Sequence, residues 1–510
     1  MKNEPQTGRG AFPAFSGKEP GKELGKELWQ ESPEAGVWDY SVPGREGVAL
    51  PDVDVPGCEL PPGIPQRKEL PLPEISELDA VRHFTRLSRL NYSIDTHFYP
   101  LGSCTMKYNP RISEKIAALP GFSLAHPLLP EFLCQGSLEI MELLQNFLAE
   151  ISGFQAISLQ PAAGAHGELC GVMMIRAYHQ KNGDSRRLRM LIPDSAHGTN
   201  PASVAMCGFQ AVQVPSDSRG NIDIQALKSL CDDTLAGLML TNPNTLGLFE
   251  ERLTEAVEAV HNAGGLVYGD GANLNALLGV FRPGDAGIDV MHFNLHKTFG
   301  TPHGGGGPGA GPVGAGRKLA PFLPGPRVLR EGTVLRLAMP ENSIGRVKAF
   351  YGNFSVLVKA CTFIAMLGAK GLRAVSENAV LNANYLKKLI ERGYSIPYNR
   401  TCMHEFVASG HLSDTIHALD VAKRLIDYGC HPPTIYFPLI VKEALMIEPT
   451  ESESRKTLEA FADAMLAIAE EARHNPDIVK TAPHGTPVGR LDEVSAARNP
   501  VLKHSNEKAP

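Results

Sequence analysis

Lys297 stands between an apolar segment and a loop that is very rich in glycine, NLHKTFGTPHGGGGPGAGPVGAG at residues 294–316. A lysine amine becomes nucleophilic when desolvation or a neighbouring cation lowers its pKa, and it can then form a Schiff base with a carbonyl compound. Most lysines, however, are solvated surface groups. The position of Lys297 therefore indicates Schiff-base chemistry only in combination with other residues.

Asp270 ends the apolar segment GGLVYGD, residues 264–270, and lies between two glycines. A carboxylate at the end of a buried strand loses hydration and needs a partner. The protonated pyridine nitrogen of a cofactor is one such partner, and the pairing keeps the ring able to accept electrons. A helix cap or a turn aspartate is the alternative interpretation.

Two further segments carry groups that suit a phosphorylated aromatic cofactor. Small residues from Ala162 to Ala165 open a predicted helix, and free backbone N–H groups there could bind phosphate. His197 follows the predicted strand 188–193, where an imidazole could stack on a cofactor ring and transfer protons. A plain tight turn and a helix-capping histidine are the respective alternatives.

The elements that must position these residues follow from the apolar pattern between residues 157 and 295, where short apolar segments alternate with helical ones. This alternation predicts a parallel sheet with helices on both faces. The predicted strands are residues 188–193, 209–215, 235–241, 264–270 and 290–295. Ligands of such domains bind at the carboxyl ends of the strands, so the four features should meet along one edge.

Composition and periodicity divide the chain into five segments. These are an extended N-terminal arm at 1–75, a helix and loop at 76–125, a large α/β domain at 126–370, a small α+β domain at 371–480 and a C-terminal tail at 481–510. The first helix is expected to begin near Leu78. In the small domain, HEFVAS and TIYFPLIV are predicted strands, and residues 451–474 are a predicted helix with a capping box of Thr450 and Glu453.

The composition excludes several classes of protein. The 510 residues carry a net charge of −6 with no basic stripe, which disfavours a nucleic-acid partner, and there is no polybasic cluster for an anionic membrane. The sequence contains no run of about 18 apolar residues, so no membrane span is expected. The N-terminus lacks the apolar region of a secretory signal. Nine scattered cysteines without a CxxC pair disfavour a disulfide framework and a metal site, and favour a cytoplasmic protein.

Other motifs carry less weight. Gly309, Gly311 and Gly314 satisfy G-x-G-x-x-G, but no strand directly precedes them, so a dinucleotide site is not expected. The sequence contains no P-loop. His404 and Glu405 lack the second histidine of a zinc protease motif and are interpreted as part of a strand.

Phosphate loop, stacking histidine, aspartate and lysine follow one another in the order of the fold-type-I pyridoxal-phosphate enzymes, whose architecture resembles aspartate aminotransferase. The strings YPLGSCTMKYNP, PDSAHGTNPAS, YGDGAN and LHKTF–PHGGGGPG closely resemble the P-protein of the glycine cleavage system. HPPTIYFPLIV and MIEPTE resemble its C-terminal part. The similarity extends from about residue 80 to 495 and corresponds to the cofactor-bearing C-terminal half of the P-protein, often called subunit 2.

The resemblance implies a set of site residues. Lys297 would form the Schiff base with pyridoxal 5'-phosphate, Asp270 would pair with the pyridine nitrogen, and His197 would stack on the ring. The remaining cofactor-binding residues would be Gly164, Ala165, Ala272 and His296. The loop with Ser103, Cys104, Thr105 and Lys107 would line the substrate site, with Lys107 as the candidate for binding the glycine carboxylate.

The resemblance also implies the activity of a glycine dehydrogenase (aminomethyl-transferring, decarboxylating). Glycine would lose CO2, and its aminomethyl group would pass to the lipoyl arm of the carrier H-protein. The expected partners are lipoylated H-protein and P-protein subunit 1, with two copies of each half.

Three rival hypotheses remain. An aminotransferase usually has an arginine in the small domain for the substrate carboxylate, and Arg400 is the only obvious candidate. A cysteine desulfurase needs a reactive cysteine on a mobile loop, for which Cys104 is conceivable. A non-enzymatic scaffold half of a two-subunit complex is disfavoured by the presence of Lys297 and Asp270.

Overall fold

The computed structural model describes residues 34–67, 70, 72–304 and 307–502. The chain forms two compact units. The larger consists of Ile94–Leu425 and Cys430–Lys480, and the smaller consists of the chain up to Ser93 together with Ile426–Gly429 and the segment from Thr481 onward. The candidate site lies entirely in the larger unit.

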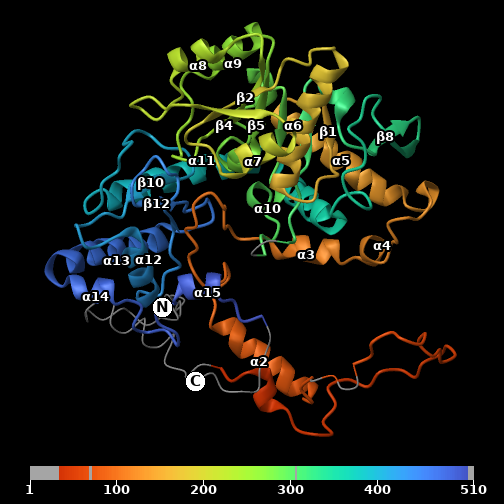
Figure 1. Ribbon diagram of the computed structural model, residues 1–510, viewed down its shortest axis with the longest axis vertical. Helices are drawn as coiled ribbons and strands as arrows, with labels where there is room; N and C mark the ends of the chain where they lie inside the picture. Colours follow the sequence, from red (N-terminus) through yellow and green to blue (C-terminus); the bar gives the residue numbers. More distant parts are fainter. Residues whose placement is uncertain (1–33, 68–69, 71, 305–306, 503–510) are drawn as a thin grey trace, which may run out of the picture. The chain divides into compact units, whose positions relative to one another are not determined.

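A seven-stranded sheet is the centre of the larger unit, with strand order β1-β7-β6-β5-β4-β2-β3 (Figure 1). Strands β2 to β6 are parallel, whereas β7 is antiparallel to both β1 and β6. The strands are β1 (Ala156–Ser158), β2 (Arg189–Pro193), β3 (Gln210–Val214), β4 (Leu235–Thr241), β5 (Leu266–Asp270), β6 (Val290–His292) and β7 (Val313–Ala315).

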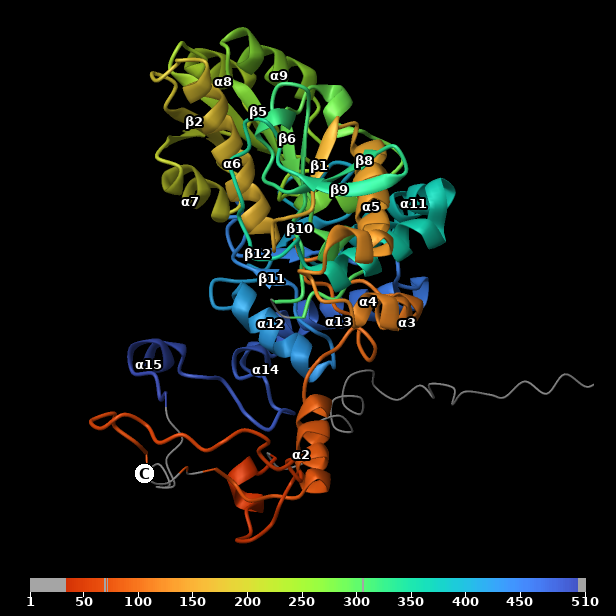
Figure 2. The same ribbon diagram turned by 90° about the vertical axis from the view of Figure 1, so that its right-hand side faces the viewer.

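Helices cover both faces of this sheet because successive strand residues point to opposite sides. Leu238, Leu240 and Val267 join one buried cluster with α5 (Gln135–Ser152), α8 (Ile224–Leu230), α9 (Leu253–Asn262) and α11 (Phe354–Ile390). Met239, Leu266 and Tyr268 join the other with α6 (Gly164–Lys181) and α7 (Thr199–Met206). Figure 2 shows α6 and α7 on one side of the sheet and α5 on the other.

Glycines let helix α6 approach the sheet closely. A Cβ atom at Gly167 would lie 2.4 Å from the carbonyl oxygen of Gly311, and one at Gly171 would lie 2.6 Å from the ring of Tyr268. Real Cβ atoms do not approach other atoms so closely, so these positions require glycine. The N-terminus of α6 is thereby held directly over the strand ends.

A three-stranded antiparallel sheet of order β10-β12-β11 forms the second layer of the larger unit. Its strands are β10 (Phe406–Ser409), β11 (Thr434–Ile435) and β12 (Ala444–Ile447). Its helices are α12 (Ala418–Asp427), α13 (Arg455–His474) and α14 (Pro476–Lys480). Helix α11 is kinked at Gly368, which has φ 59°, so the boundary predicted at residue 370 falls inside this helix.

Further elements belong to each unit. The larger unit also contains α3 (Arg111–Ala117), α4 (Pro120–Ser123), α10 (Leu295–Thr298) and a hairpin of β8 (Arg327–Glu331) and β9 (Val334–Ala338). The smaller unit contains α2 (Glu77–Arg89) and α15 (Glu493–Arg498). The 3-10 helices are η1 (Val37–Tyr40), η2 (Glu131–Leu133), η3 (Gly271–Ala276), η4 (Pro283–Ala286) and η5 (Ala320–Phe322).

Two predictions for the small α+β part were wrong. Helix α13 begins at Arg455, and the Ser454 hydroxyl caps it by accepting a hydrogen bond from the Thr457 N–H, so Thr450 and Glu453 form no capping box. Of the predicted strand TIYFPLIV only β11 pairs, because Tyr436 has a left-handed φ of 61° and Pro438 lacks an N–H. The central strand is instead β12, residues 444–447.

Helix α11 is long and apolar enough, by length and composition alone, to cross a membrane. It contains no uninterrupted run of about 18 apolar residues, because Lys359 and Lys370 interrupt it, so the prediction made from the sequence is not contradicted. Val356, Leu357 and Phe363 of this helix are buried in the core cluster beneath the large sheet. The core helix of a soluble protein can have the same composition, so the composition of α11 is only weak evidence for a membrane span.

Candidate active site

The predicted chemical groups gather at one edge of the large sheet. Asp270 ends β5, and His197 lies in the loop between β2 and α7. Lys297 lies in α10 after β6, and Gly164 begins α6 after β1 (Figure 1). Because these strands are parallel, their carboxyl ends share this edge.

Lys297 is half-buried, and among the described residues its ammonium has no hydrogen-bond or ion-pair partner. Burial lowers the pKa of His197, and the charge of Lys297 lowers it further against the opposing effect of Asp270. The same lysine charge helps to lower the pKa of Asp270. Lys297 therefore lies within electrostatic reach of both groups, with its amine free to react.

Asp270 is fully buried at the end of β5, yet the pKa of its carboxyl is lowered. Burial raises it, but His292, His197, the Ala272 N–H and Lys297 together outweigh that effect. Burial lowers the pKa of His292 to about 4, so this histidine is neutral at pH 7. The Ala272 N–H, 2.9 Å from Oδ1, and the Lys297 charge thus remain to hold Asp270 ionised.

The second carboxylate oxygen of Asp270 is less engaged. Its contact is the Asn200 side-chain amide at 3.5 Å, the limit for a hydrogen bond. Oδ2 can therefore accept a stronger bond from a protonated ring nitrogen. Ala272 acts on the same carboxylate by donating its N–H to Oδ1.

The imidazole of His197 is held from two sides. Its Nε2 lies 3.1 Å from the Ser103 hydroxyl, and its ring stacks on Phe437 with centroids 5.2 Å apart and planes 17° apart. Among the described residues no aromatic ring contacts its other face. A planar cofactor could stack there.

The N-terminus of α6 offers a cradle for phosphate. Among the described residues, the backbone N–H groups of Gly164, Ala165 and His166 have no partner. A Cβ atom at Gly164 would lie 2.0 Å from Asn294 Oδ1, so only glycine fits against the segment that carries Lys297. Free N–H groups at the start of an 18-residue helix suit a phosphate dianion.

Unsatisfied polar atoms also lie next to Lys297. His296 Nδ1, Thr298 Oγ1 and Thr301 Oγ1 are buried without a hydrogen-bond partner among the described residues. Burial lowers the pKa of His296 to about 3. Buried polar groups normally have partners, so these atoms, with the α6 cradle and the Asp270 oxygen, fit a phosphorylated pyridine aldehyde.

The loop Ser103–Lys107 is closely tied to the rest of the unit. The Ser103 N–H donates to Glu405 Oε2 at 2.7 Å, and Thr105 donates through its N–H and hydroxyl to the carboxylate of Glu448. The Ser103 hydroxyl and the Cys104 thiol remain for substrate. Burial raises the pKa of the Cys104 thiol, and Lys297 offsets this only in part.

Lys107 requires a correction. Its buried ammonium donates to Asn275 Oδ1 at 2.7 Å, to the Thr298 carbonyl at 2.7 Å and to Glu451 Oε1 at 2.8 Å. An ammonium has three donors, and all three are used. Lys107 is therefore not placed to bind the carboxylate of glycine.

Sequence reasoning missed several buried groups around the site. Glu168 accepts hydrogen bonds from Thr199, Asn200 and Ser203, and burial together with Asp270 raises its pKa to about 7. The donor atoms of His404, Glu405 and Glu448 lie within 4.8 Å of one another, a set that could hold a metal ion. The polar residues in GAHGEL, HEF and MIEPTE were the only sequence signals for these groups.

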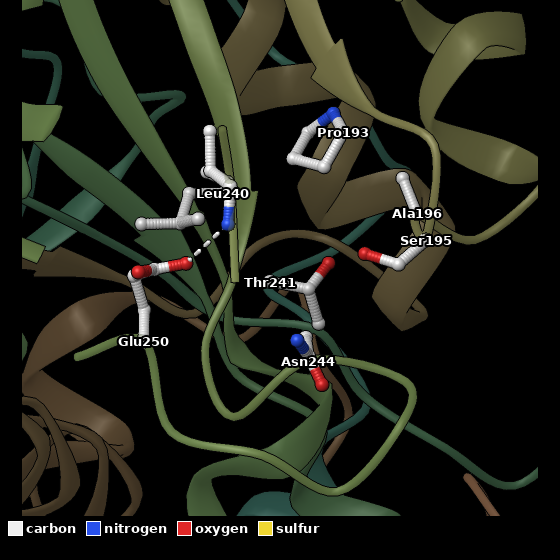
Figure 3. Close-up of a pocket in the computed structure, with 8 residues that line it drawn as sticks. Pro193, Ser195, Ala196, Leu240, Thr241, Asn244 and Glu250 are labelled. Carbon is white, nitrogen blue, oxygen red and sulfur yellow. Dashed lines mark hydrogen bonds between the residues drawn. The ribbon is translucent and has the colours of Figure 1, made fainter. Parts of the chain in front are cut away.

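A small pocket adjoins the same strand ends (Figure 3). Its walls include Pro193 at the end of β2, Thr241 at the end of β4, and Glu250, which accepts a hydrogen bond from the Ile222 N–H at 2.8 Å. None of the predicted site residues lines it. The pocket is therefore separate from the Lys297 site.

Comparison with known proteins decides the family. The glycine dehydrogenase C-terminal domain family matches residues 375–484. A probable glycine dehydrogenase (decarboxylating) subunit 2 of Desulforamulus reducens is 57% identical over 476 residues, 91% of this chain and 98% of that protein. Proteins of the same description from Thermotoga petrophila and Listeria monocytogenes are 54% and 53% identical over 92% of this chain and 99% and 98% of theirs.

The chain belongs to the family of glycine dehydrogenase (decarboxylating) subunit 2. The resemblance to the P-protein inferred from sequence strings is thus confirmed.

Solved structures show which fold this chain adopts. A glycine decarboxylase (P-protein) of the glycine cleavage system, in inhibitor-bound form, superposes with a TM-score of 0.67 at 21% identity, over 80% of this chain and 92% of that one. A cysteine desulfurase from Thermococcus onnurineus NA1 gives a TM-score of 0.58 at 14% identity, over 74% of this chain and 95% of that one. The predicted fold-type-I class is confirmed.

The environments of Arg400 and Cys104 disfavour the two rival PLP-dependent chemistries. Arg400 pairs with Glu251 at 2.8 Å and donates to Asn221 Oδ1 at 2.7 Å, so its guanidinium is committed to a structural ion pair. The raised pKa of Cys104 keeps its thiol protonated, whereas a desulfurase needs a thiolate. All nine cysteines are free.

Proposed function

We propose that this chain is the pyridoxal-phosphate-bearing subunit of a glycine cleavage enzyme. It decarboxylates glycine, releases CO2 and transfers the aminomethyl group to the lipoyl arm of H-protein. The main support for this proposal is that Lys297, Asp270, His197 and the N-terminus of α6 meet at one edge of the sheet. The chain that brings them together is a member of this family.

Each residue has a defined task in this proposal. The N–H groups of Gly164 and Ala165 would hold the phosphate, and Asp270 would pair with the ring nitrogen. His197 would lie against the ring, and Lys297 would supply the amine that holds the cofactor covalently. When bound, pyridoxal phosphate supplies an electron sink for the charge left on glycine as CO2 departs.

The substrate loop orients glycine. The Ser103 hydroxyl lies 3.1 Å from His197 Nε2. Because burial lowers the pKa of His197, its imidazole is neutral and can carry its proton on Nε2. In that tautomer Nε2–H donates to the Ser103 oxygen, and the hydroxyl proton is available for a substrate carboxylate. Lys107 holds this loop to α10 instead of binding substrate. Thr298 and Thr301, whose hydroxyls lack partners, offer further donors beside Lys297.

The partners follow from the family. The description "subunit 2" implies a subunit 1. We propose two copies of each half, with lipoylated H-protein as the acceptor, acting in the cytoplasm. The nine free cysteines fit a reducing compartment.

The test compares Lys297→Ala with Lys318→Ala, an exposed lysine after β7. Both variants should fold, as judged by circular dichroism. Only Lys297→Ala should lose the visible absorbance of the cofactor Schiff base and glycine decarboxylation. Normal absorbance and turnover in Lys297→Ala would refute the assignment.

A further inference from the structure

We infer that Glu405 and Glu448 are positioning residues that hold the Ser103–Thr105 loop in the conformation that presents Ser103 to His197 and to substrate. The inference deepens the proposed function and rests on it for the identity of the substrate. The two carboxylates touch neither the substrate nor Lys297 directly in this account; they act through the loop.

The backbone of the loop needs an external anchor. Ser103 has φ 64° and Thr105 has φ 40°, both in the left-handed region that non-glycine residues rarely adopt. Such conformations persist only where the surroundings determine them. One glutamate meets each strained residue: Glu405 accepts from the Ser103 N–H at 2.7 Å, and Glu448 from the Thr105 N–H at 3.0 Å.

The anchors are themselves firmly held. Glu405 and Glu448 are fully buried beside β10 and at the end of β12, and both carboxylates face the loop. The Gly102 N–H donates to the Met446 carbonyl, and the Glu448 N–H to the Pro100 carbonyl, so the loop also pairs with β12 through its backbone. A Cβ at Gly102 would lie 2.5 Å from that Met446 oxygen, so only glycine lets the loop approach β12 this closely.

Protonation of the pair is consistent with this role. Burial and the mutual effect of two adjacent carboxyls raise the pKa of Glu405, and burial raises the pKa of Glu448 to about 7. Burial lowers the pKa of neighbouring His404 to about 3, so it is neutral and is not a counter-ion. A carboxyl group keeps an acceptor oxygen whether or not it carries a proton, so both glutamates can accept the loop N–H bonds in either state.

A metal ion explains these residues less well. His404 Nε2 lies 3.8 Å from Glu405 Oε1 and 4.0 Å from Glu448 Oε1. Ligands of a tetrahedral ion at about 2.1 Å are roughly 3.4 Å apart, closer than this set. Both oxygens of Glu448 and one of Glu405 already accept bonds from the loop. Hydrogen bonds to the loop account for three of the four carboxylate oxygens without an ion, and Glu405 Oε1 has no hydrogen-bond partner among the described residues.

The anchoring also restricts how the loop can recognise its ligand. The N–H groups of Ser103 and Thr105 are occupied by the protein's own carboxylates, and the Cys104 N–H by the Leu101 carbonyl. A substrate carboxylate can therefore be bound by side chains of this loop but not by these three N–H groups. Loss of an anchor should raise KM for glycine more than it lowers kcat.

The test measures amide hydrogen exchange of residues 101–107 in the full-length holo chain without glycine, so it does not depend on the reaction. Glu405→Ala should speed exchange at Ser103 at least tenfold. Glu405→Gln, whose amide oxygen can still accept the Ser103 N–H, should stay near wild type. Glu250→Ala is the matched control, since Glu250 is a buried glutamate that accepts the N–H groups of Ile222 and Arg252 away from the loop.

Steady-state kinetics with the partner proteins complete the test. Glu405→Ala should raise KM for glycine about tenfold, with a smaller fall in kcat, and Glu405→Gln should restore it. Thr105→Val, which removes only the hydroxyl bond to Glu448, should give a smaller increase in exchange and keeps the test open if Glu405→Ala does not fold. The inference would be overturned if amide exchange in the loop were unchanged in Glu405→Ala and in Thr105→Val. It would also be overturned if Glu250→Ala increased exchange in the loop as much as Glu405→Ala does. If Glu405→Ala speeds exchange in the loop but the wild-type protein does not turn over glycine, only the proposed function is refuted.

Discussion

Lys107 Nζ donates a 2.7 Å hydrogen bond to the carbonyl oxygen of Thr298, the residue directly after Lys297. The substrate loop and the short helix that carries the reactive lysine are therefore tied to one another. The same ammonium also pairs with Glu451 at 2.8 Å and lies 5.1 Å from the centre of the Phe363 ring. One buried cation thus joins four parts of the larger unit.

Replacement of Lys107 by methionine should lower the free energy of unfolding by about 3–5 kcal/mol, because Glu451 would be left nearly buried without its partner. Chemical denaturation measures this loss. The control is Lys359→Met, whose partner Glu114 is half-exposed and can regain water, so the cost there should stay below about 1 kcal/mol. If Lys107→Met were as stable as the wild type but had a higher KM for glycine, Lys107 would instead bind the carboxylate of glycine.

Much of the fold could be predicted because its central strands are largely apolar. Residues 235–241 were predicted as a strand and form β4, every residue of which is buried. Strands β1 and β7 were missed because they have only three residues each, and β7 includes a glycine of the glycine-rich segment. The capping box at Thr450 was a local match overridden by Ser454, since the chain bends at Thr450 with φ 62°.

Site residues could be predicted from the sequence only where they lie at the carboxyl end of a predicted strand. Lys297, Asp270 and His197 each follow a strand, so their meeting place follows from the parallel sheet. Glu405 and Glu448 act on Ser103 and Thr105 across more than 300 residues of sequence, a distance that no local pattern reports. The role of Lys107 was misassigned for the same reason, because its partner Glu451 lies equally far along the chain.

Gly164→Ala should reduce the affinity for pyridoxal phosphate at least tenfold, about 1.4 kcal/mol, because the added Cβ would lie 2.0 Å from Asn294 Oδ1 and displace the phosphate cradle. Fluorescence titration of the cofactor into the stripped protein measures the change. Gly136→Ala is the matched control near the start of α5, where a Cβ meets no atom within 4 Å. Equal affinity in both variants would remove the α6 N-terminus from the cofactor site.

Glu168 should make the stability of the cofactor-free protein fall as pH rises. Its pKa is raised from 4.5 to about 7 in the folded state, so the folded protein holds the proton between these values and the unfolded chain does not. The contribution is fully present below pH 4.5 and is lost as pH rises through about 7, by up to about 3 kcal/mol. Denaturation midpoints at pH 5 and pH 8 should differ less in Glu168→Gln than in the wild type. An identical pH dependence in both proteins would show that Glu168 is ionised throughout.

The central claim is tested most directly by exchange of labelled bicarbonate into the carboxyl group of glycine, measured with this chain, its subunit 1 and lipoylated H-protein. Exchange should require all three proteins, persist in Lys318→Ala and vanish in Lys297→Ala. Absence of exchange from a wild-type protein that still shows Schiff-base absorbance would keep the cofactor at Lys297 but contradict glycine decarboxylation.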